Sequence, residues 1–197
     1  MILSLQGCMA VGKTTAINYL KENAKYVNIS YEENSHIVRE IKERKLDKNV
    51  YEDYIEIQTL WLENEIDRYN KAKEFGCSIM DFGMEEIVFH TLSYPSTIGM
   101  DWDIEAGMRD ILTRARRCMP DRILFLDASD DVLRKRKEND PTRSRNSFDN
   151  YLKNFMPLKR KFMSMLDNVD YLNVDTLSKE EVALRVKEWV DNCIKEK

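Results

Sequence analysis

The sequence has few of the residues that mark specialised protein classes. Among its 197 residues it contains six glycines and four prolines, which excludes a low-complexity or collagen-like chain. Its four cysteines, Cys8, Cys77, Cys118 and Cys193, lack the spacing of a metal or redox motif. We therefore expect free thiols in a reducing cytosol. The only two histidines are not spaced for metal binding either.

The sequence also lacks the features of a membrane or exported protein. No apolar stretch approaches the roughly 18 residues that a membrane span requires. The first residues lack the basic start of a signal peptide, and Met1 leads directly into an apolar run. We therefore expect a cytoplasmic protein without a membrane partner.

Charge excludes a further class. The formal net charge of −4 argues against general nucleic-acid binding. The length suits one domain over residues 1–197, and 43% hydrophobic residues suffice for a core. The charge is uneven, because residues 134–161 hold ten Lys and Arg against three Asp and Glu. This local excess indicates either an anion-binding element or a solvated helix face.

The most informative feature that is present is a phosphate-binding loop. Residues 7–15 read GCMAVGKTT, a complete G-x-x-x-x-G-K-T pattern. Its glycines allow a turn whose N–H groups point at a phosphate, Lys13 can reach the outer phosphates, and the Thr14 hydroxyl can hold Mg²⁺. An apolar run precedes the loop and an amphipathic segment follows it, as this motif requires. The candidate nucleotide-binding residues here are Gly7, Ala10, Val11, Gly12, Lys13, Thr14 and Thr15.

The rest of the chain alternates between short apolar runs and helical patterns. This alternation predicts an α/β fold with a parallel sheet and a ligand at the carboxyl ends of the strands. We predict a loop over residues 93–101, a break at Pro157 and a capping box at Ser178 and Glu181. The strands are expected over residues 1–6, 26–30, 77–82, 123–126 and 171–174, and the main helices over 14–22, 32–45, 50–75, 85–92, 103–117 and 148–166.

The loop alone does not say what happens to the nucleotide. No Asn-Lys-x-Asp motif occurs in the sequence, which argues against a GTPase. Motor-type and AAA ATPases usually need a longer chain. A small kinase needs a phosphate loop, an acceptor pocket and a lid.

Three segments resemble the thymidylate kinase and deoxynucleoside kinase branch of the P-loop kinases. They are the phosphate loop, residues 120–136 (PDRILFLDASDDVLRKR) and residues 171–175 (YLNVD) with the helix after them. The resemblance implies a three-layer α/β/α fold with a five-stranded parallel sheet and a helical lid at about residues 134–147. It also implies Mg²⁺-dependent transfer of a phosphoryl group from ATP to a small-molecule acceptor, a nucleoside or a nucleoside monophosphate.

The resemblance implies that lid arginines close over the phosphates. Arg143 and Arg145 lie in a polar segment between two helices, and Arg136 precedes it. Guanidinium groups suit phosphate oxygens because their N–H donors form a planar fork. The alternative interpretation is an exposed, solvated basic segment.

A carboxylate is also needed, either for Mg²⁺ or toward the acceptor hydroxyl. Asp81 ends the third predicted strand beside the loop, and Glu33, or its neighbour Glu32, follows the second. Asp127 also follows a strand, but the resemblance favours a structural or capping role for it. The family's third strand normally ends in Asp-Arg or Glu-Arg, whereas this chain has Phe82 after Asp81.

The acceptor pocket is expected on the long helix at residues 50–75. The residues that share a helical face there are Tyr54, Gln58, Trp61 or Leu62, Glu65 and Arg68. A glutamine there resembles the family's base-binding glutamine, and an aromatic ring could stack on a base. The alternative is that Trp61 packs in the core and Gln58 is merely exposed. Arg109 and Asp103 are further candidates for this pocket.

Two rival functions stay open at this point. The acceptor could be an antibiotic or metabolite hydroxyl, because the motif arginine after Asp81 is missing. The chain could also be a regulatory ATPase whose conformation is its output. The sequence does not decide the oligomeric state, and a homodimer is left open.

Overall fold

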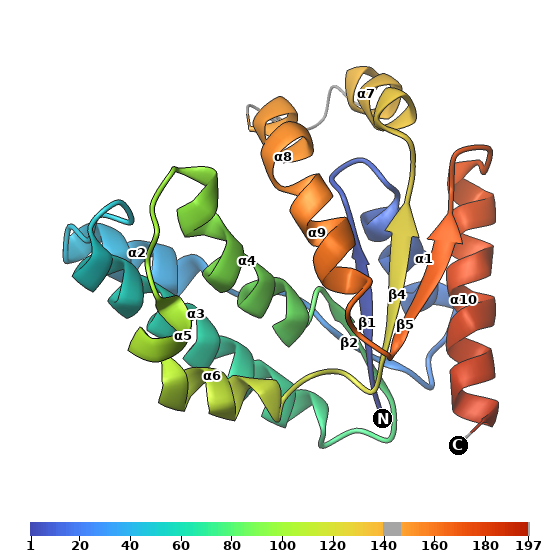
Figure 1. Ribbon diagram of the computed structural model, residues 1–197. Helices are drawn as coiled ribbons and strands as arrows, with labels where there is room; N and C mark the ends of the chain where they lie inside the picture. The colour runs from blue at the N-terminus through green and yellow to red at the C-terminus, as the bar shows by residue number, and fades with distance from the viewer. Residues whose placement is uncertain (140–146, 197) are drawn as a thin grey trace.

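The computed structural model describes residues 1–139 and 147–196. Its centre is a five-stranded sheet in the order β2-β3-β1-β4-β5, and every neighbouring pair is parallel (Figure 1). The predicted α/β fold with a five-stranded parallel sheet is confirmed. The strands are β1 (Ile2–Gly7), β2 (Asn28–Ser30), β3 (Ser78–Asp81), β4 (Arg122–Asp127) and β5 (Val169–Asn173).

Helices cover both faces of this sheet. On one face α1 (Lys13–Asn23) packs against α10 (Lys179–Lys195), and on the other α3 (Tyr51–Ala72) packs against α4 (Met84–Thr97) and α6 (Arg109–Arg116) (Figure 1). The α9 helix (Met156–Met163) contacts α4, so the layer continues toward the carboxyl ends of the strands. The remaining helices are α2 (Ser35–Glu43), α5 (Ile104–Gly107), α7 (Asp130–Glu138) and α8 (Phe148–Asn154).

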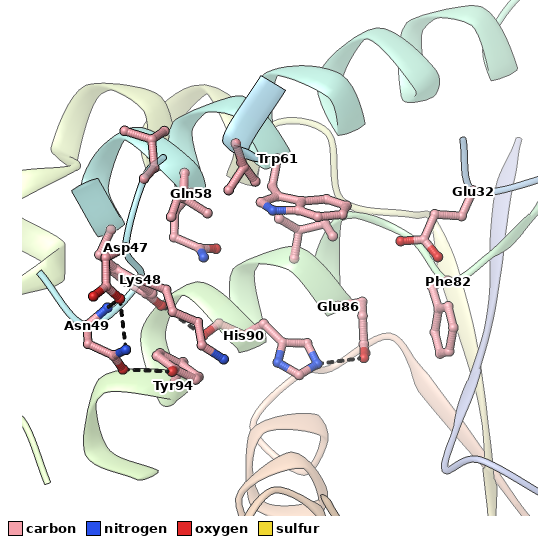
Figure 2. Close-up of a pocket in the computed structure, with 15 residues that line it drawn as sticks. Glu32, Asp47, Lys48, Asn49, Gln58, Trp61, Phe82, Glu86, His90 and Tyr94 are labelled. Atoms are coloured by element: carbon pink, nitrogen blue, oxygen red, sulfur yellow. Dashed lines mark hydrogen bonds and ion pairs between the residues drawn. The ribbon is translucent and has the colours of Figure 1, made fainter. Parts of the chain in front are cut away.

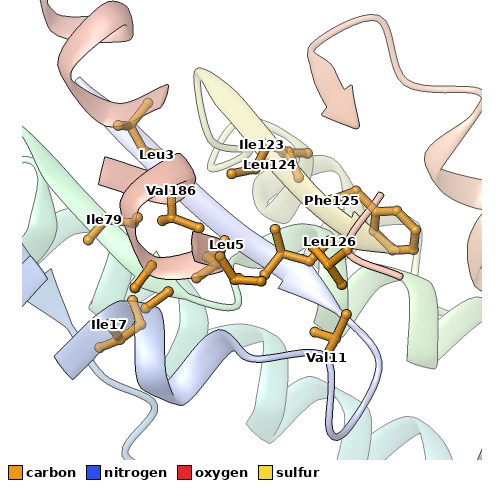
Figure 3. Packing of buried hydrophobic residues seen from close by; sticks show 14 of the residues in the cluster. Leu3, Leu5, Val11, Ile17, Ile79, Ile123, Leu124, Phe125, Leu126 and Val186 are labelled. Atoms are coloured by element: carbon orange, nitrogen blue, oxygen red, sulfur yellow. The ribbon is translucent and has the colours of Figure 1, made fainter. Parts of the chain in front are cut away.

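The central strand β1 is buried along its whole length, as expected for a strand covered on both sides. Leu3 and Leu5 point into the cluster beneath α1 and α10, together with Ile17 and Val186 (Figure 3). Ile2 points the other way, into the cluster formed with α3, α4 and α6. This alternation follows from the two-residue period of a strand.

The predicted loop over residues 93–101 is wrong in its first half, because α4 continues to Thr97 through Pro95. A proline inside a helix removes the N–H that would bind the carbonyl four residues earlier. Here that carbonyl belongs to Thr91, and it accepts a 2.8 Å hydrogen bond from the Tyr54 hydroxyl instead. A side chain on α3 therefore compensates for the missing backbone donor.

Two other local predictions are confirmed, and one predicted helix is divided in two. The capping box is confirmed, because Ser178 Oγ accepts from the Glu181 N–H and the Glu181 side chain accepts from the Ser178 N–H. The break near Pro157 is also confirmed, since α8 ends at Asn154 and α9 begins at Met156. The single helix over residues 103–117 is divided at Met108 into α5 and α6.

Two further expectations concern the cysteines and the possibility of a membrane-spanning helix. All four cysteines are buried, and none of them forms a disulfide within the described residues. In the part of the chain that the structure describes, no helix combines the length and the apolar character needed to cross a membrane.

Candidate active site

The phosphate loop connects β1 to α1 at the carboxyl edge of the sheet. Its backbone has positive φ at Gly7 (139°), Ala10 (67°) and Gly12 (115°). At Gly7 a side chain is excluded, because a Cβ would lie 2.4 Å from the Leu126 carbonyl oxygen on the neighbouring β4. Such turns gather N–H groups into a concave anion site, and the first turn of α1 adds its unpaired N–H groups. The loop therefore has the shape that a phosphate chain requires.

Lys13 lies at the centre of this site. Its ammonium donates to the Gly7 and Cys8 carbonyls at 2.7 and 2.9 Å, and it lies over the Phe82 ring, 4.5 Å from the ring centroid. Burial, followed by the positive charge of Lys159, lowers the pKa of Lys13 to about 8. The carboxylates of Asp81 and Glu86 act in the opposite direction.

Asp81 is placed beside the loop by the sheet register. It ends β3 opposite Leu5 of β1, and it is half-buried within electrostatic range of Lys13. Thr14 follows Lys13 at the exposed start of α1. A hydroxyl and a carboxylate are oxygen ligands of the kind that a hard divalent cation prefers.

Asp127 is occupied by a structural contact. Arg160 donates from Nε and Nη2 to its carboxylate at 3.0–3.2 Å, and the Ala128 N–H donates at 2.9 Å. This geometry agrees with the structural role that the sequence favours for Asp127.

A cavity of about 720 Å³ opens between α3, α4 and the segment around residues 46–49. Tyr54, Gln58 and Trp61 line it, as predicted for the acceptor pocket, and Figure 2 shows Gln58 and Trp61 reaching into it from α3. Tyr54 stacks on Tyr94, with ring centroids 5.6 Å apart. The other lining residues are Glu32, Ile41, Leu46, Asp47, Lys48, Asn49, Ile57, Phe82, Glu86, Ile87, His90 and Tyr94.

Three predicted residues lie away from this cavity. Arg68 is buried and binds Glu65 through two hydrogen bonds of 2.7 and 2.8 Å, while it also donates to the Ser30, Asp81 and Phe82 carbonyls. Arg109 is exposed at the start of α6. Glu33 is exposed as well, and of the two adjacent glutamates it is Glu32 that borders the cavity.

Of the three arginines predicted for the lid, the structure describes one. Arg136 donates to the backbone carbonyls of Val11, Val174 and Leu177 at 2.6–3.2 Å, so it joins the phosphate loop to the segment after β5. Arg143 and Arg145 lie outside the described residues.

No pattern in the sequence indicates the ion pair that lies between the loop and the cavity. Glu86 on α4 and Lys159 on α9 are both buried, and Lys159 Nζ lies 2.5 Å from Glu86 Oε2. His90 Nε2 lies 3.2 Å from Glu86 Oε1 (Figure 2). In the sequence, Glu86 resembles an ordinary acidic residue in a first helical turn, and Lys159 lies in a basic run.

A second buried carboxylate supports the turn between β3 and α4. Glu85 Oε1 accepts from Ser4 Oγ, from Gln6 Nε2 at 2.6 Å and from the Gly83 N–H at 3.0 Å. Burial raises the pKa of this carboxyl group. Phe82 precedes Gly83 with a φ of 58°, an unusual value for a bulky residue. The side chains of β1 and the Arg68 guanidinium thus hold Phe82 between the loop and the cavity.

Comparison with known proteins places this geometry in a fold group. The thymidylate kinase from Candida albicans is similar at a TM-score of 0.70 and 16% identity, over 100% of this chain and 93% of that chain. The deoxyadenosine kinase from M. mycoides with bound dCTP is similar at a TM-score of 0.66 and 16% identity, over 100% of both chains. The chain has a P-loop nucleotide kinase fold. No family model and no curated protein matches this P-loop chain in sequence.

Proposed function

We propose that this chain is a kinase that transfers the terminal phosphoryl group of ATP to a hydroxyl of a nucleoside. The observation that carries the proposal is the meeting of two sites at Phe82. One face of the structure holds the phosphate loop with Lys13 over the Phe82 ring, and Phe82 also lines the aromatic cavity. A donor and an acceptor bound to these two sites would be adjacent, as transfer between them requires.

On the donor side, the loop amides and Lys13 would bind the phosphates of ATP. Thr14 and Asp81 would hold Mg²⁺, which when bound neutralises charge on the phosphate oxygens. We propose further that the single domain carries a lid at about residues 134–147 whose Arg143 and Arg145 approach the transferred group. Fixed cations stabilise the charge that develops there.

On the acceptor side, the cavity suits a flat, hydrogen-bonding molecule such as a nucleobase. Trp61, Tyr54 and Tyr94 provide aromatic walls. Gln58 Oε1 accepts a 2.9 Å hydrogen bond from Thr91 Oγ1, which fixes the amide and leaves its N–H₂ group as a donor for the ligand. The chemistry of this wall supports a base-binding role for Gln58 and Trp61.

The charge of the cavity favours a nucleoside over a nucleoside monophosphate. Glu32, Asp47 and Glu86 line it, whereas Lys48 is the one lysine or arginine among its described lining residues. Arg68, an arginine predicted for this pocket, is engaged with Glu65 and backbone carbonyls. A phosphate dianion in this cavity would meet like charges, and a neutral nucleoside would not.

The proposal is tested by ADP release with a panel of nucleosides and nucleoside monophosphates in the presence of Mg·ATP. We expect at least one nucleoside to raise ADP production well above basal hydrolysis, and its monophosphate to do so far less. If no nucleoside, nucleotide or other small hydroxyl compound raises ADP production, the kinase proposal is wrong. Faster turnover of the monophosphate would contradict the choice of a nucleoside.

Gln58 should control the affinity for the acceptor. We expect Gln58→Leu to raise the KM for the nucleoside by roughly tenfold to a hundredfold, because a base edge would lose its hydrogen-bond partner in a buried site. The KM for ATP should change little. The matched control is Asn70→Leu, an exposed polar residue on the same helix. An unchanged acceptor KM in Gln58→Leu would contradict the base-binding role.

The lowered pKa of Lys13 predicts pH-dependent nucleotide binding. Because this pKa is about 8 in the free protein, Lys13 loses its charge as the pH rises above 8. Bound phosphates favour the charged form, so the affinity for ATP should fall by up to about tenfold per pH unit above pH 8. Calorimetry in two buffers of different ionisation enthalpy should show proton uptake on binding at pH 9.

The control for this effect is Lys13→Arg. An arginine stays protonated throughout this pH range, so any affinity that it retains should vary little between pH 7 and pH 9.5. Equal pH dependence in the wild type and in Lys13→Arg would show that another group titrates.

A further inference from the structure

Glu86 lies at the junction between the two sites. It is 8% exposed and lines the acceptor cavity, and its charge also acts on Lys13 of the phosphate loop. Figure 2 places its carboxylate between His90 and Phe82. The junction is where an acceptor hydroxyl would have to lie in order to reach a phosphoryl group held by Lys13.

The surroundings of Glu86 keep its carboxylate ionised and oriented. Lys159 Nζ lies 2.5 Å from Oε2, and His90 Nε2 lies 3.2 Å from Oε1. The charge of Lys159 and the hydrogen bond with His90 lower the pKa of Glu86 well below its usual range, although burial acts against them. Lys159 itself is fully buried, and its ammonium also donates to Tyr151 Oη at 3.4 Å and lies over the Phe82 ring at 5.2 Å.

The two oxygens of this carboxylate differ in their surroundings. Within residues 1–139 and 147–196, no donor forms a hydrogen bond of good geometry with Oε2, although the Lys159 ammonium is close to it. A buried carboxylate oxygen without an aligned donor is costly in an ordinary core. Because Oε2 is out of contact with solvent beside Lys159, a ligand hydroxyl in the cavity would approach the carboxylate from the side of Oε1 and His90.

We propose that Glu86 is the catalytic residue that binds the acceptor hydroxyl, and that Lys159 is the positioning residue that holds it. This inference rests on the proposed kinase function. The hydroxyl oxygen forms a bond to the terminal phosphorus of ATP while the bond from that phosphorus to the bridging oxygen breaks, and ADP leaves with that electron pair. Glu86 orients the hydroxyl, accepts its proton as the new bond forms, and releases the proton to water with the product.

Glu86 is a better candidate than the other acidic residues near the junction. Asp81 does not line the cavity, and Glu32 lines it but is exposed. Asp47 lies with Lys48 and Asn49 at the end of the cavity away from Phe82 (Figure 2). Glu86 alone of these four combines contact with the cavity, burial and an electrostatic effect on Lys13.

The first test compares Glu86→Gln with Glu32→Gln in the nucleoside kinase assay. We expect Glu86→Gln to lower kcat by roughly a hundredfold or more, with the Kd for ADP within about threefold of the wild type. Glu32→Gln should lower kcat far less. Retention of wild-type kcat in Glu86→Gln, with a large loss in Glu32→Gln, would overturn the proposal.

The second test isolates the role of Lys159. Groups that face Glu86 are Lys159 on α9, Tyr151 on α8, His90 and Glu85 on α4, and Lys13 on α1. Removing the Lys159 charge raises the pKa of Glu86, so its carboxylate becomes protonated as the pH falls. In Lys159→Met, kcat should therefore fall as the pH is lowered through a range in which the wild type keeps its kcat.

A purely structural role for Lys159 would lower the amount of folded protein without creating this acidic limb. Lys161→Met, an exposed lysine on the same helix, is the matched control and should keep the wild-type profile. Because Lys159→Met leaves Glu86 buried without its cation, folding is checked by thermal unfolding, and Lys159→Arg serves as a second variant that keeps the charge. An acidic limb in Lys159→Arg as large as in Lys159→Met would contradict the charge effect.

Failure of the kinase proposal can be distinguished from failure of this inference. If the wild type phosphorylates no acceptor, the kinase proposal fails, and Glu86 is then tested by binding alone. Calorimetry with a nucleoside and its 5′-deoxy analogue should show a preference for the hydroxyl of about tenfold, and Glu86→Leu/Lys159→Met should lose it. Equal preference in the wild type and the double variant would exclude hydroxyl binding by Glu86.

Discussion

Lys13→Met should abolish phosphoryl transfer while the protein stays folded. We expect kcat to fall by roughly 1,000-fold, because in the proposed site the Lys13 ammonium would be the cation that the loop presents to the phosphates. Methionine has a similar length, and it removes a charge whose burial is the largest cause of the lowered pKa of Lys13. The unfolding midpoint should therefore stay within a few degrees of the wild type. Steady-state ADP release and differential scanning calorimetry measure the two quantities.

A matched substitution on the same helix separates the loss of charge from the loss of lysine. Lys21 is exposed in the last turn of α1, and Lys21→Met should retain wild-type kcat. More than a tenth of wild-type activity in Lys13→Met would show that transfer does not depend on the loop lysine. A similar loss in both variants would indicate a general effect of charge on α1.

The parts of the site that follow from local sequence could be predicted. The glycines at 7 and 12 mark the loop because its backbone needs positive φ at both positions. Helical spacing placed Tyr54, Gln58 and Trp61 on one face of α3, and all three border the cavity. These positions follow from the sequence because each depends on contacts within one element or between an element and the loop beside it.

The parts that depend on contacts between distant elements could not be predicted. Arg68 continues the face of Tyr54 and Gln58, but it lies beyond the cavity, where the ends of β2 and β3 present carbonyls to it. Spacing identifies a face but not the point along it where the cavity ends. The pair of Glu86 and Lys159 joins α4 to α9, and no local pattern in either segment indicates the other.

Compensation by a distant side chain also explains the error at Pro95. A proline in a polar segment predicts a loop because it lacks an N–H. The Tyr54 hydroxyl satisfies the Thr91 carbonyl, and this contact spans 37 positions in the sequence. The same tyrosine stacks on Tyr94, so one residue of α3 stabilises the end of α4 and forms a wall of the cavity.

The largest effect on stability is expected from Arg68→Leu. The Arg68 and Glu65 side chains are buried, and the guanidinium forms two hydrogen bonds with the carboxylate. Removing one partner of a buried ion pair leaves the other charge uncompensated, which typically costs about 3–5 kcal/mol. Arg68 also donates to the Ser30 carbonyl at 3.0 Å and to the Phe82 carbonyl at 2.5 Å, so the ends of β2 and β3 lose a donor as well. Urea unfolding should show this decrease in the free energy of unfolding.

Two further variants separate these contributions. Glu65→Leu/Arg68→Leu removes the pair as a unit, so it should recover part of the loss, but the carbonyls at Ser30 and Phe82 would still lack their donor. Lys71→Leu, an exposed residue on the same helix, should change the free energy of unfolding by less than about 0.5 kcal/mol. Full recovery in the double variant would mean that the backbone contacts contribute nothing. Because those contacts hold Phe82 between the loop and the cavity, partial recovery of stability should be accompanied by impaired phosphoryl transfer.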